Sequence, residues 1–311
     1  MVACFRRCYG DTYPAGDFYD VERLQQRIDS GSLRSVVAIA EDGALVGHTG
    51  LTVRHPGANA IEAGNTVVDP ACRSQGLLGR LAKALTELCT GERYVAYLHY
   101  PTTAHEIMQK ASVRGGGVET GVMLDYIPAE TEYRGIDQAT GRLAATVVYQ
   151  PFSAAPARDL WLPADYVDLA SELYRHAGLE RSLRIPNDHV EAQYTTARVT
   201  LNAKRGLLNV HVTGAGNDLA HVVADARAAH RCALMHVDLC MDDAGIGRAA
   251  ATLRRAGFFF CALLPEFAHT DVLRLQRLQQ PSPTSLAPAL ANPLARRLLD
   301  RMRAEFSATV Q

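Results

Sequence analysis

The sequence has no apolar stretch of the ~18–20 residues that a helix needs to cross a membrane. Near its start, Arg6 and Arg7 interrupt a short apolar segment, which therefore lacks the pattern of a signal peptide. We expect no membrane partner and a cytoplasmic protein. With 48% hydrophobic residues among 311, the chain can form two domains of ordinary size or one large one.

Cysteine is scarce and its spacing is uninformative for metal binding. The chain has seven cysteines, an odd number, and no Cys-x-x-Cys pair. Cys4 and Cys8 are one helical turn apart, which is typical of a helix face. We therefore expect neither a disulfide framework nor a metal site, and most thiols should pack in the core of a protein from a reducing compartment.

Neither sign of charge predominates. The chain has 32 Lys and Arg residues against 33 Asp and Glu residues, which gives a formal net charge of −1. A nucleic-acid-binding domain usually carries an excess of basic residues gathered on one face. We therefore expect no nucleic-acid partner.

The most informative segment is a strand, a turn and a helix in succession. Residues 61–68 are mostly apolar and predict a strand, and leucines at helical spacing predict a helix that starts near residue 77. Between them, Arg73 supplies a permanent cation and Gly76 allows a close approach to the backbone. The unpaired N–H groups of a first helical turn bind phosphate well. The alternative is an ordinary strand–turn–helix unit with a glycine in its turn.

This segment resembles the pyrophosphate-binding motif of the GNAT N-acetyltransferases, Arg/Gln-x-x-Gly-x-Gly/Ala. Arg73 and Gly76 match the motif, whereas Leu78 stands where the family usually has Gly or Ala, and Gly79 comes one residue later. The resemblance covers about residues 1–128. It implies acetyl-CoA, or another acyl-CoA, as co-substrate, with the pantetheine arm along the strand and the pyrophosphate on the loop.

The residues that the resemblance assigns to binding this co-substrate belong to the end of the strand, the loop and the first helical turn. They are Thr66, Val67, Val68, Arg73, Ser74, Gln75, Gly76, Leu77, Leu78 and Gly79.

Two residues are candidates for proton transfer. Glu62 lies in the otherwise apolar strand, where a raised pKa would suit a general base that deprotonates the amine; alternatively it is a carboxylate on a solvated rim. The family often has a tyrosine acid on the helix after the next strand, but Met108 occupies that position. His105 is the nearest titratable group and the candidate acid, unless it only begins the helix. His99 and Tyr100 are further candidates.

The order of expected elements predicts an α/β fold with a mixed, mostly antiparallel sheet and helices on both faces. Two GNAT-like units are expected in tandem, because residues 194–264 repeat the strand–strand–helix–strand–helix–strand pattern of the first half. We expect a GNAT domain over residues 1–130, a degenerate copy over 131–280, and a Pro-rich linker with an amphipathic helix over 281–311. That helix should dock on the body or on a second copy of the chain, as in a homodimer.

The second copy should not bind CoA. Its strand–helix junction contains Gly214 and Gly216 without an accompanying basic residue in the sequence. Asp238, Asp242 and Asp243 are better explained as a strand-end acid and a helix cap than as a metal cluster.

The expected function is transfer of an acetyl group from acetyl-CoA to the amine of a small molecule by direct attack. Two alternatives stay open. One is a catalytically weak GNAT-like protein that binds CoA or a metabolite as a sensor or scaffold, which Met108 and Leu78 favour. The other is transfer of a longer acyl chain. The sequence does not identify the acceptor amine.

Overall fold

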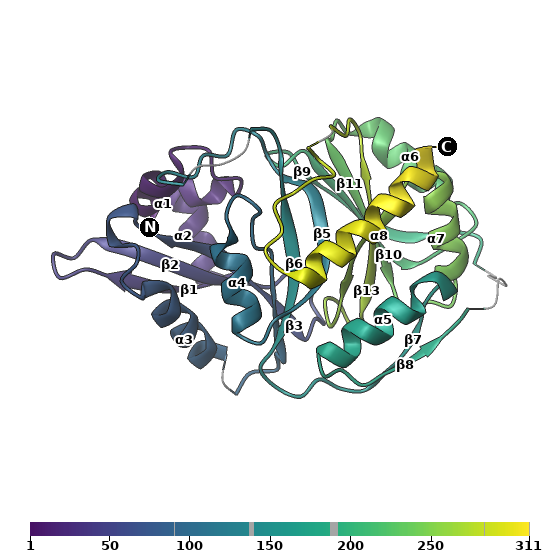
Figure 1. Cartoon of the computed structure of the whole chain (residues 1–311), viewed down its shortest axis with the longest axis horizontal. Coiled ribbons are helices and arrows are strands. Elements are labelled where there is room, and N and C mark those ends of the chain that lie inside the picture. Colours follow the sequence, from purple (N-terminus) through teal and green to yellow (C-terminus); the bar gives the residue numbers. More distant parts are fainter. Residues whose placement is uncertain (90, 137–139, 187–191, 283, 311) are drawn as a thin grey trace.

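Figure 1 shows the computed structural model, which describes residues 1–89, 91–136, 140–186, 192–282 and 284–310. Residues 137–139 of the segment between the two expected units and residue 283 of the expected linker lie outside this part. The described helices and turns are α1 (Val2–Tyr9), η1 (Gly16–Tyr19), α2 (Val21–Asp29), η2 (Pro70–Cys72), α3 (Leu77–Cys89), α4 (Glu106–Arg114), α5 (Ala164–His176), α6 (Leu219–Ala229), α7 (Ile246–Arg255) and α8 (Pro293–Val310).

Eleven strands of the described part form one sheet with β1 and β9 at its edges. They are β1 (Leu33–Ile39), β2 (Leu45–Thr52), β3 (Ala60–Val68), β4 (Ala96–His99), β5 (Val118–Ile127), β6 (Leu143–Pro151), β9 (Thr196–Asn202), β10 (Leu207–Gly214), β11 (Leu234–Cys240), β12 (Phe259–Leu264) and β13 (Val272–Leu278). The short strands β7 (Arg158–Trp161) and β8 (Arg181–Arg184) form a separate parallel pair.

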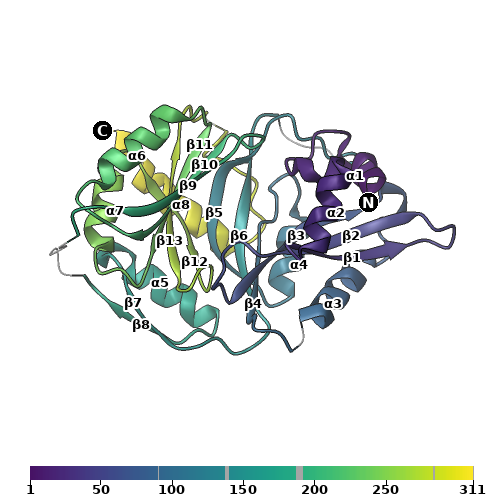
Figure 2. The ribbon, with the colours of Figure 1, turned by 180° about the vertical axis from the view of Figure 1, so that it is seen from behind.

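The two halves of the large sheet have the same strand order. In the first half the neighbours are β2, β3, β4, β6 and β5, and in the second they are β9, β10, β11, β13 and β12. In each series the second and third strands are parallel and the other pairs are antiparallel. Helices α4 and α8 lie on one face (Figure 1), and α1 and α2 lie on the other (Figure 2). The mixed α/β fold with two GNAT-like units is confirmed.

The strand β6 changes where the two units should be divided. We expected the first unit to end near residue 130, but β6 lies between β4 and β5 and pairs with both. An antiparallel strand that fills the middle of a half-sheet belongs to that half. We therefore propose a boundary just after β6, near residue 151.

The halves join where β5 meets β12. The backbones come so close at Gly121 and Ala262 that a Cβ on Gly121 would lie 2.3 Å from the Cβ of Ala262 and from the carbonyl oxygen of Cys261. Beyond this pair the strands separate, and the buried amide of Gln276 donates to the Val122 carbonyl and accepts from the Leu124 N–H. The Gln276 side chain thus supplies bonds that a neighbouring strand would otherwise make.

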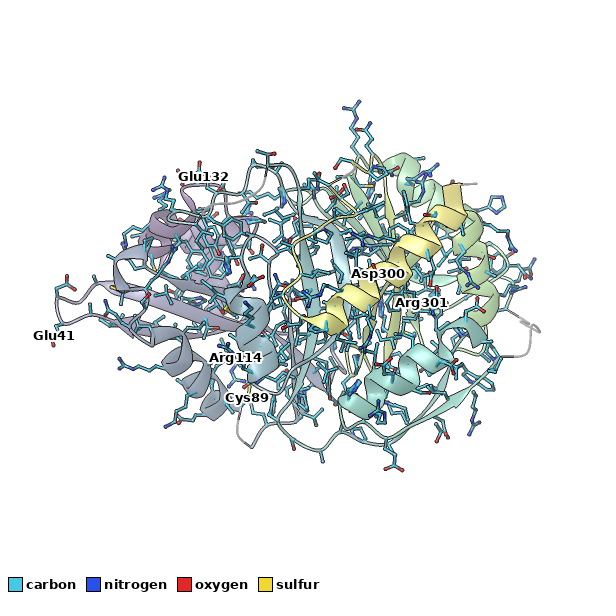
Figure 3. The ribbon with its side chains drawn as sticks, viewed as in Figure 1. Glu41, Cys89, Arg114, Glu132, Asp300 and Arg301 are labelled. Atoms are coloured by element: carbon cyan, nitrogen blue, oxygen red, sulfur yellow. The ribbon has the colours of Figure 1, made fainter. Side chains whose placement is uncertain are left out.

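Helix α8 lies over this joint and contacts both β5 and β12 (Figure 1). Figure 3 shows Asp300 and Arg301 on α8, and Arg301 donates to the carbonyl oxygen of Asp165 on α5. The segment before α8, expected as a linker, is held at Gln109, whose amide donates to the Ala289 carbonyl and accepts from the Ala291 N–H. The expected docking of the C-terminal helix on the body is thus observed.

A buried charge cluster makes a second connection between the halves. Glu266 is fully buried and accepts from Arg158 and Arg181 at 2.6–2.7 Å, and its carboxylate also accepts from the Asn59 side chain at 2.8 Å. Its carbonyl accepts from the N–H groups of Asn59 and Ala60 at the start of β3. The start of β3 is thereby fixed by a loop of the second half.

Most expected elements are present, including the β9–β10 hairpin and the helices after it, but three strands were not expected. β7 and β8 have four residues each, which is too short for a periodic pattern. β13 does alternate, because Leu273 and Leu275 are each followed by a polar residue, Arg274 and Gln276, so its signal was present in the sequence. In the part that the structure describes, no helix combines the length and apolar character required to cross a bilayer.

The close approach at the joint predicts that Gly121→Ala destabilises the protein. The added methyl group has no space beside Ala262, so we expect a loss of about 1–3 kcal/mol in the free energy of unfolding, measured by urea titration. Gly79→Ala in α3 is the control, because its Cβ would meet no atom within 4 Å; it should gain about 0.5–1 kcal/mol. Equal effects of the two substitutions would contradict the tight joint.

The Glu266 cluster predicts a pH-dependent contribution to stability. Burial acts to raise the pKa of Glu266, but the hydrogen bond and charge of Arg158 outweigh it, so this pKa lies below its ordinary value. Glu266→Gln should cost about 3–5 kcal/mol at pH 7. Because the native pKa is lowered, the difference from the wild type should persist above about pH 4.3 and shrink as the pH falls through the folded pKa.

The control for this measurement is Glu132→Gln. Glu132 lies at the surface beside α1 (Figure 3) and forms only a 3.6 Å ion pair with Arg134. Its substitution should change the free energy of unfolding by less than about 0.5 kcal/mol. A Glu266→Gln variant as stable as this control would show that the buried cluster does not stabilise the fold.

Candidate functional site

The site begins where β3 and β4 separate. These parallel strands are paired only from Ala60 to Glu62 on β3 and from Ala96 to Leu98 on β4. Past that point, within the described residues, β3 continues to Val68 with no strand beside it on this edge. On its other edge it still pairs with β2, with an irregularity at Asn65, whose φ is 53°. A strand edge with free backbone groups is therefore exposed to any molecule that enters the gap.

A cavity of about 420 Å³ fills this gap and reaches the loop before α3. Two loop residues have a left-handed backbone, Ser74 with φ 63° and Gly76 with φ 73°, and a Cβ on Gly76 would meet no atom within 4 Å. The N-terminus of α3 follows at Leu77. A glycine at a helix start beside an open cavity is suited to a phosphate group.

The Arg73 side chain lies along the wall of this cavity. Its guanidinium donates to the Arg134 carbonyl at 2.8 Å and, more weakly, to the Val68 carbonyl at 3.4 Å. The loop after β5 is also bonded to α1, because the Arg134 N–H donates to the Cys8 carbonyl. Arg73 thus connects the end of β3 to this loop and keeps further N–H donors for a ligand.

The structure brings most of the predicted co-substrate residues to one cavity. Those that line it are Thr66, Val67, Val68, Arg73, Ser74, Gly76, Leu77 and Leu78. Gln75 and Gly79 do not line it. Leu78, which departs from the family motif, contributes an apolar wall.

A second cavity of about 160 Å³ adjoins the first on the side of Glu62. Five residues line both cavities and define the neck between them: Tyr9, Thr66, His105, Met108 and Tyr133. A molecule bound along β3 and another bound in the second cavity would meet at this neck.

His105 lies at the neck, where it precedes α4. Its Nδ1 is buried and has no hydrogen-bond partner among the described atoms. Burial and the charge of Arg73 lower the pKa of His105, so its imidazole is neutral at neutral pH. A neutral ring with an unpaired nitrogen can accept a proton or donate one, depending on its tautomer.

Glu62 has a different environment from the one expected. Its carboxylate forms two 2.6 Å hydrogen bonds with the guanidinium of Arg54. Burial acts to raise the pKa of Glu62, but the Arg54 charge outweighs it and the pKa lies below its ordinary value. The expected rise in this pKa is therefore wrong, because β3 places the carboxylate next to an arginine that the sequence pattern did not indicate.

Tyr133 was not anticipated as a site residue. It comes from the loop after β5, its hydroxyl donates to Thr102 Oγ1 at 3.1 Å, and its ring meets that of His105 edge-on at 6.2 Å. Burial raises the pKa of Tyr133, so the hydroxyl keeps its proton. Because this loop is distant in sequence from the phosphate loop, no local motif could have identified the tyrosine.

The second half forms the wall of a third cavity, of about 320 Å³, which adjoins the second one. Both are lined by Glu62, Tyr100, Tyr126 and Arg205. Arg205 belongs to the turn of the β9–β10 hairpin, and Asp238 and Arg274 come from β11 and β13. The hairpin thus reaches the cleft of the first half.

The corresponding strands of the second half leave no gap. β10 and β11 stay paired over six residues, from Leu207 to Val212 on β10. At their helix junction, a Cβ on Gly216 would lie 2.3 Å from the carbonyl carbon of Tyr194, so backbone already covers this loop. The junction itself has no basic residue, but Arg248 and Arg255 of α7 line a small cavity beside it.

The acidic residues near the end of β11 do not form one cluster. Asp238 is paired with Arg274, and Asp243 accepts from the N–H groups of Ala215 and Gly245 before α7. Asp242 lies 2.7 Å from His269, and these two with Cys240 have their potential ligand atoms within 4.8 Å of one another. The expected roles of strand-end acid and helix cap are therefore wrong in detail, because Asp238 lies within β11 and the N-cap of α7 is Gly245, two residues after Asp243.

Comparison with known proteins gives a family match for the first part of the chain. Residues 1–110 match the sequence profile of the acetyltransferase (GNAT) family. No curated protein matches the chain.

Among solved structures, the chain is similar to many acetyltransferases, including the following three. A GCN5-related N-acetyltransferase from Kribbella flavida is 20% identical, with 49% of this chain and 90% of that chain covered and a TM-score of 0.37. A phosphinothricin acetyltransferase from Sinorhizobium meliloti in complex with AcCoA is 15% identical, with 50% of this chain and 85% of that chain covered and a TM-score of 0.38. A ribosomal-protein-alanine N-acetyltransferase from Brucella melitensis is 16% identical, with 42% of this chain and 75% of that chain covered and a TM-score of 0.34.

The Arg54–Glu62 pair predicts a change in the titration of Glu62. Without the Arg54 guanidinium, burial is opposed only by the weaker effects of Arg205 and Arg274, so the pKa of Glu62 should rise in Arg54→Met. Carbon-detected NMR of labelled glutamate measures it. Arg6→Met, which removes an exposed partner of Asp11, is the control and should leave Glu62 unchanged. An unchanged Glu62 midpoint in Arg54→Met would contradict the assignment.

Proposed function

We propose that this protein transfers the acetyl group of acetyl-CoA to an amine of a small molecule, and the match of residues 1–110 to the GNAT acetyltransferase profile supports the reaction type. The observation that carries the proposal is the pair of cavities that meet at the neck beside His105. One cavity has a free strand edge and a glycine loop, and the other is polar. Such a pair suits a thioester donor on one side and an acceptor on the other.

The donor would lie in the first cavity. Its pantetheine arm would bond to the free edge of β3 at Thr66, Val67 and Val68, and its pyrophosphate would lie on the loop from Arg73 to Gly76. The left-handed backbone at Ser74 and Gly76 turns the loop toward the start of α3. The thioester would then reach the neck.

At the neck, the acceptor nitrogen attacks the thioester carbonyl carbon. A carbon–nitrogen bond forms, the carbon–sulfur bond breaks, and the proton lost by the nitrogen must reach the departing thiolate. His105 is placed to carry this proton, because its ring is neutral and touches both cavities. The ionised Glu62, held by Arg54, would orient the amine and is too weak a base to be the main proton acceptor.

The second half would close the acceptor side and bind no CoA of its own. The closed pair β10–β11 leaves no place for a pantetheine arm. We therefore propose one CoA site per chain. A turnover assay that detects free CoA thiol over a panel of amines separates this enzyme from a GNAT-like protein that binds CoA without transfer.

The loop assignment predicts weaker donor binding in Arg73→Ala. Loss of the charged donor should cost about 1.5–3 kcal/mol of acetyl-CoA binding in calorimetry, whereas Arg73→Lys should retain part of it. Arg114→Ala at the end of α4 (Figure 3) should bind normally, since it lines neither cavity. Unchanged affinity in Arg73→Ala, or two CoA per wild-type chain, would show that the site is misassigned.

The proton-transfer role predicts a slow but binding-competent His105→Ala variant. We expect kcat to fall by about 10²–10⁴-fold with unchanged acetyl-CoA affinity. Since the pKa of His105 is lowered, wild-type kcat should fall on acidification only at a lower pH than an unperturbed histidine would give, as the ring becomes protonated. The control is His221→Ala, because His221 is an exposed residue of α6. A wild-type rate in His105→Ala would remove this residue from the mechanism.

A further inference from the structure

The third cavity, between the two halves, carries an excess of positive charge. Four arginines line it, against two carboxylates: Arg54, Arg198, Arg205 and Arg274, with Glu62 and Asp238. This local imbalance contrasts with the near-neutral chain as a whole, whose formal net charge is −1. Cations gathered in a cleft attract anions more strongly than the same charges spread over a surface.

The two carboxylates are already paired, each with one arginine. Glu62 accepts two hydrogen bonds from Arg54, and Asp238 accepts two from Arg274, at 2.6–2.8 Å. In the described part of the chain, no carboxylate lies within 4.0 Å of either Arg198 or Arg205. Two guanidinium groups of this cavity are therefore available to an anionic ligand.

Arg205 is held in place without using most of its donors. Its guanidinium lies over the ring of Tyr126, 4.3 Å from the centroid, and makes a single long contact of 3.4 Å to the Tyr126 carbonyl. The turn that carries it is fixed from the first half, because Arg142 donates to the Arg205 carbonyl at 2.6 Å. A guanidinium has five N–H donors, so this one is oriented and still largely free to bind.

The position of Arg205 relates it to the reaction. It lines both the second and the third cavity, and the second cavity also includes the neck. The walls of the second cavity are rich in tyrosine, with Tyr13, Tyr100 and Tyr126 added to the two tyrosines of the neck. Aromatic faces of this kind attract an ammonium group, so an acceptor could extend from the neck toward Arg205.

We propose that the acceptor is an amine that also carries an acid group, a carboxylate or a phosphate. Its nitrogen lies at the neck, and its acid group is bound by Arg205, with Arg198 beyond it. The inference rests on the proposed acetyl transfer and adds the class of acceptor. It also gives the second half a function, because both arginines come from its β9–β10 hairpin.

The first arm of the test compares acceptors that differ only in the acid group. The pairs are ornithine and putrescine, lysine and cadaverine, and phosphoethanolamine and ethanolamine, with CoA thiol release as the measurement. We expect kcat/KM to be at least tenfold higher for the acid-bearing member of the preferred pair. The carboxylate and phosphate pairs distinguish the two kinds of acid. Equal rates within every pair that reacts would overturn the acceptor class and leave acetyl transfer intact.

The second arm tests the arginines with matched variants. Arg205→Gln should raise the KM of the acid-bearing acceptor by about 10–100-fold, with little change in kcat or in the KM of acetyl-CoA, and Arg205→Lys should recover part of the loss. Arg198→Gln should act in the same direction. The control is Lys204→Ala in the same turn, since Lys204 lies over Tyr19 and lines none of these cavities. An unchanged KM in Arg205→Gln would overturn the proposal.

A binding measurement keeps the inference separate from the proposed function. Inorganic phosphate is titrated by calorimetry into protein saturated with CoA, so that the phosphate loop is occupied. We expect binding to the wild type and to Lys204→Ala, and at least tenfold weaker binding to the Arg205→Gln, Arg198→Gln double variant. Equal binding to all three would overturn the anion site. If the wild type does not bind CoA when CoA is added before the phosphate, that result would instead overturn the proposed function.

Discussion

The contact of β5 with β12 is the constraint on which the rest of the structure depends. It makes one sheet from two half-sheets of the same strand order, and it is possible only because residue 121 has no side chain in the space that Ala262 fills. Past this contact the strands diverge, and Gln276 bonds the open backbone of β5. Helix α8 then covers the joint from one face.

The two halves, although joined in one sheet with the same strand order, differ at one pair of corresponding strands. The first half keeps a gap between β3 and β4, and the second half closes the corresponding pair β10–β11. The closed half contributes its hairpin and the polar side chains of β11 and β13 to the cleft of the open half. The loop around Glu266 fixes the start of β3, the strand that carries both Glu62 and the proposed donor edge.

Local patterns were sufficient for the fold class, for most of the elements and for the first of the two cavities. Helical and alternating periodicities identified most elements, and the Arg73–Gly76 segment identified the first cavity, because a strand, a loop and a helix that follow one another in sequence also adjoin in space. The sequence was less informative where partners are distant. The pKa of Glu62 was expected to rise, and the arginine that lowers it comes from the β2–β3 connection. Strand β13 was overlooked although it alternates, because its polar residues lie in the interior.

By itself, the sequence determined the family of the first half, the tandem repeat, and a glycine loop before a helix, since all of these are properties of contiguous segments. Only the tertiary structure decided that His105 and Tyr133 meet at a neck, that Glu62 is paired, and that the hairpin of the second half brings Arg205 to the second cavity. The physical reason is that a charge acts through its surroundings. Which cation lies beside which carboxylate, and which guanidinium stays free, depends on the packing of segments that are far apart in the chain.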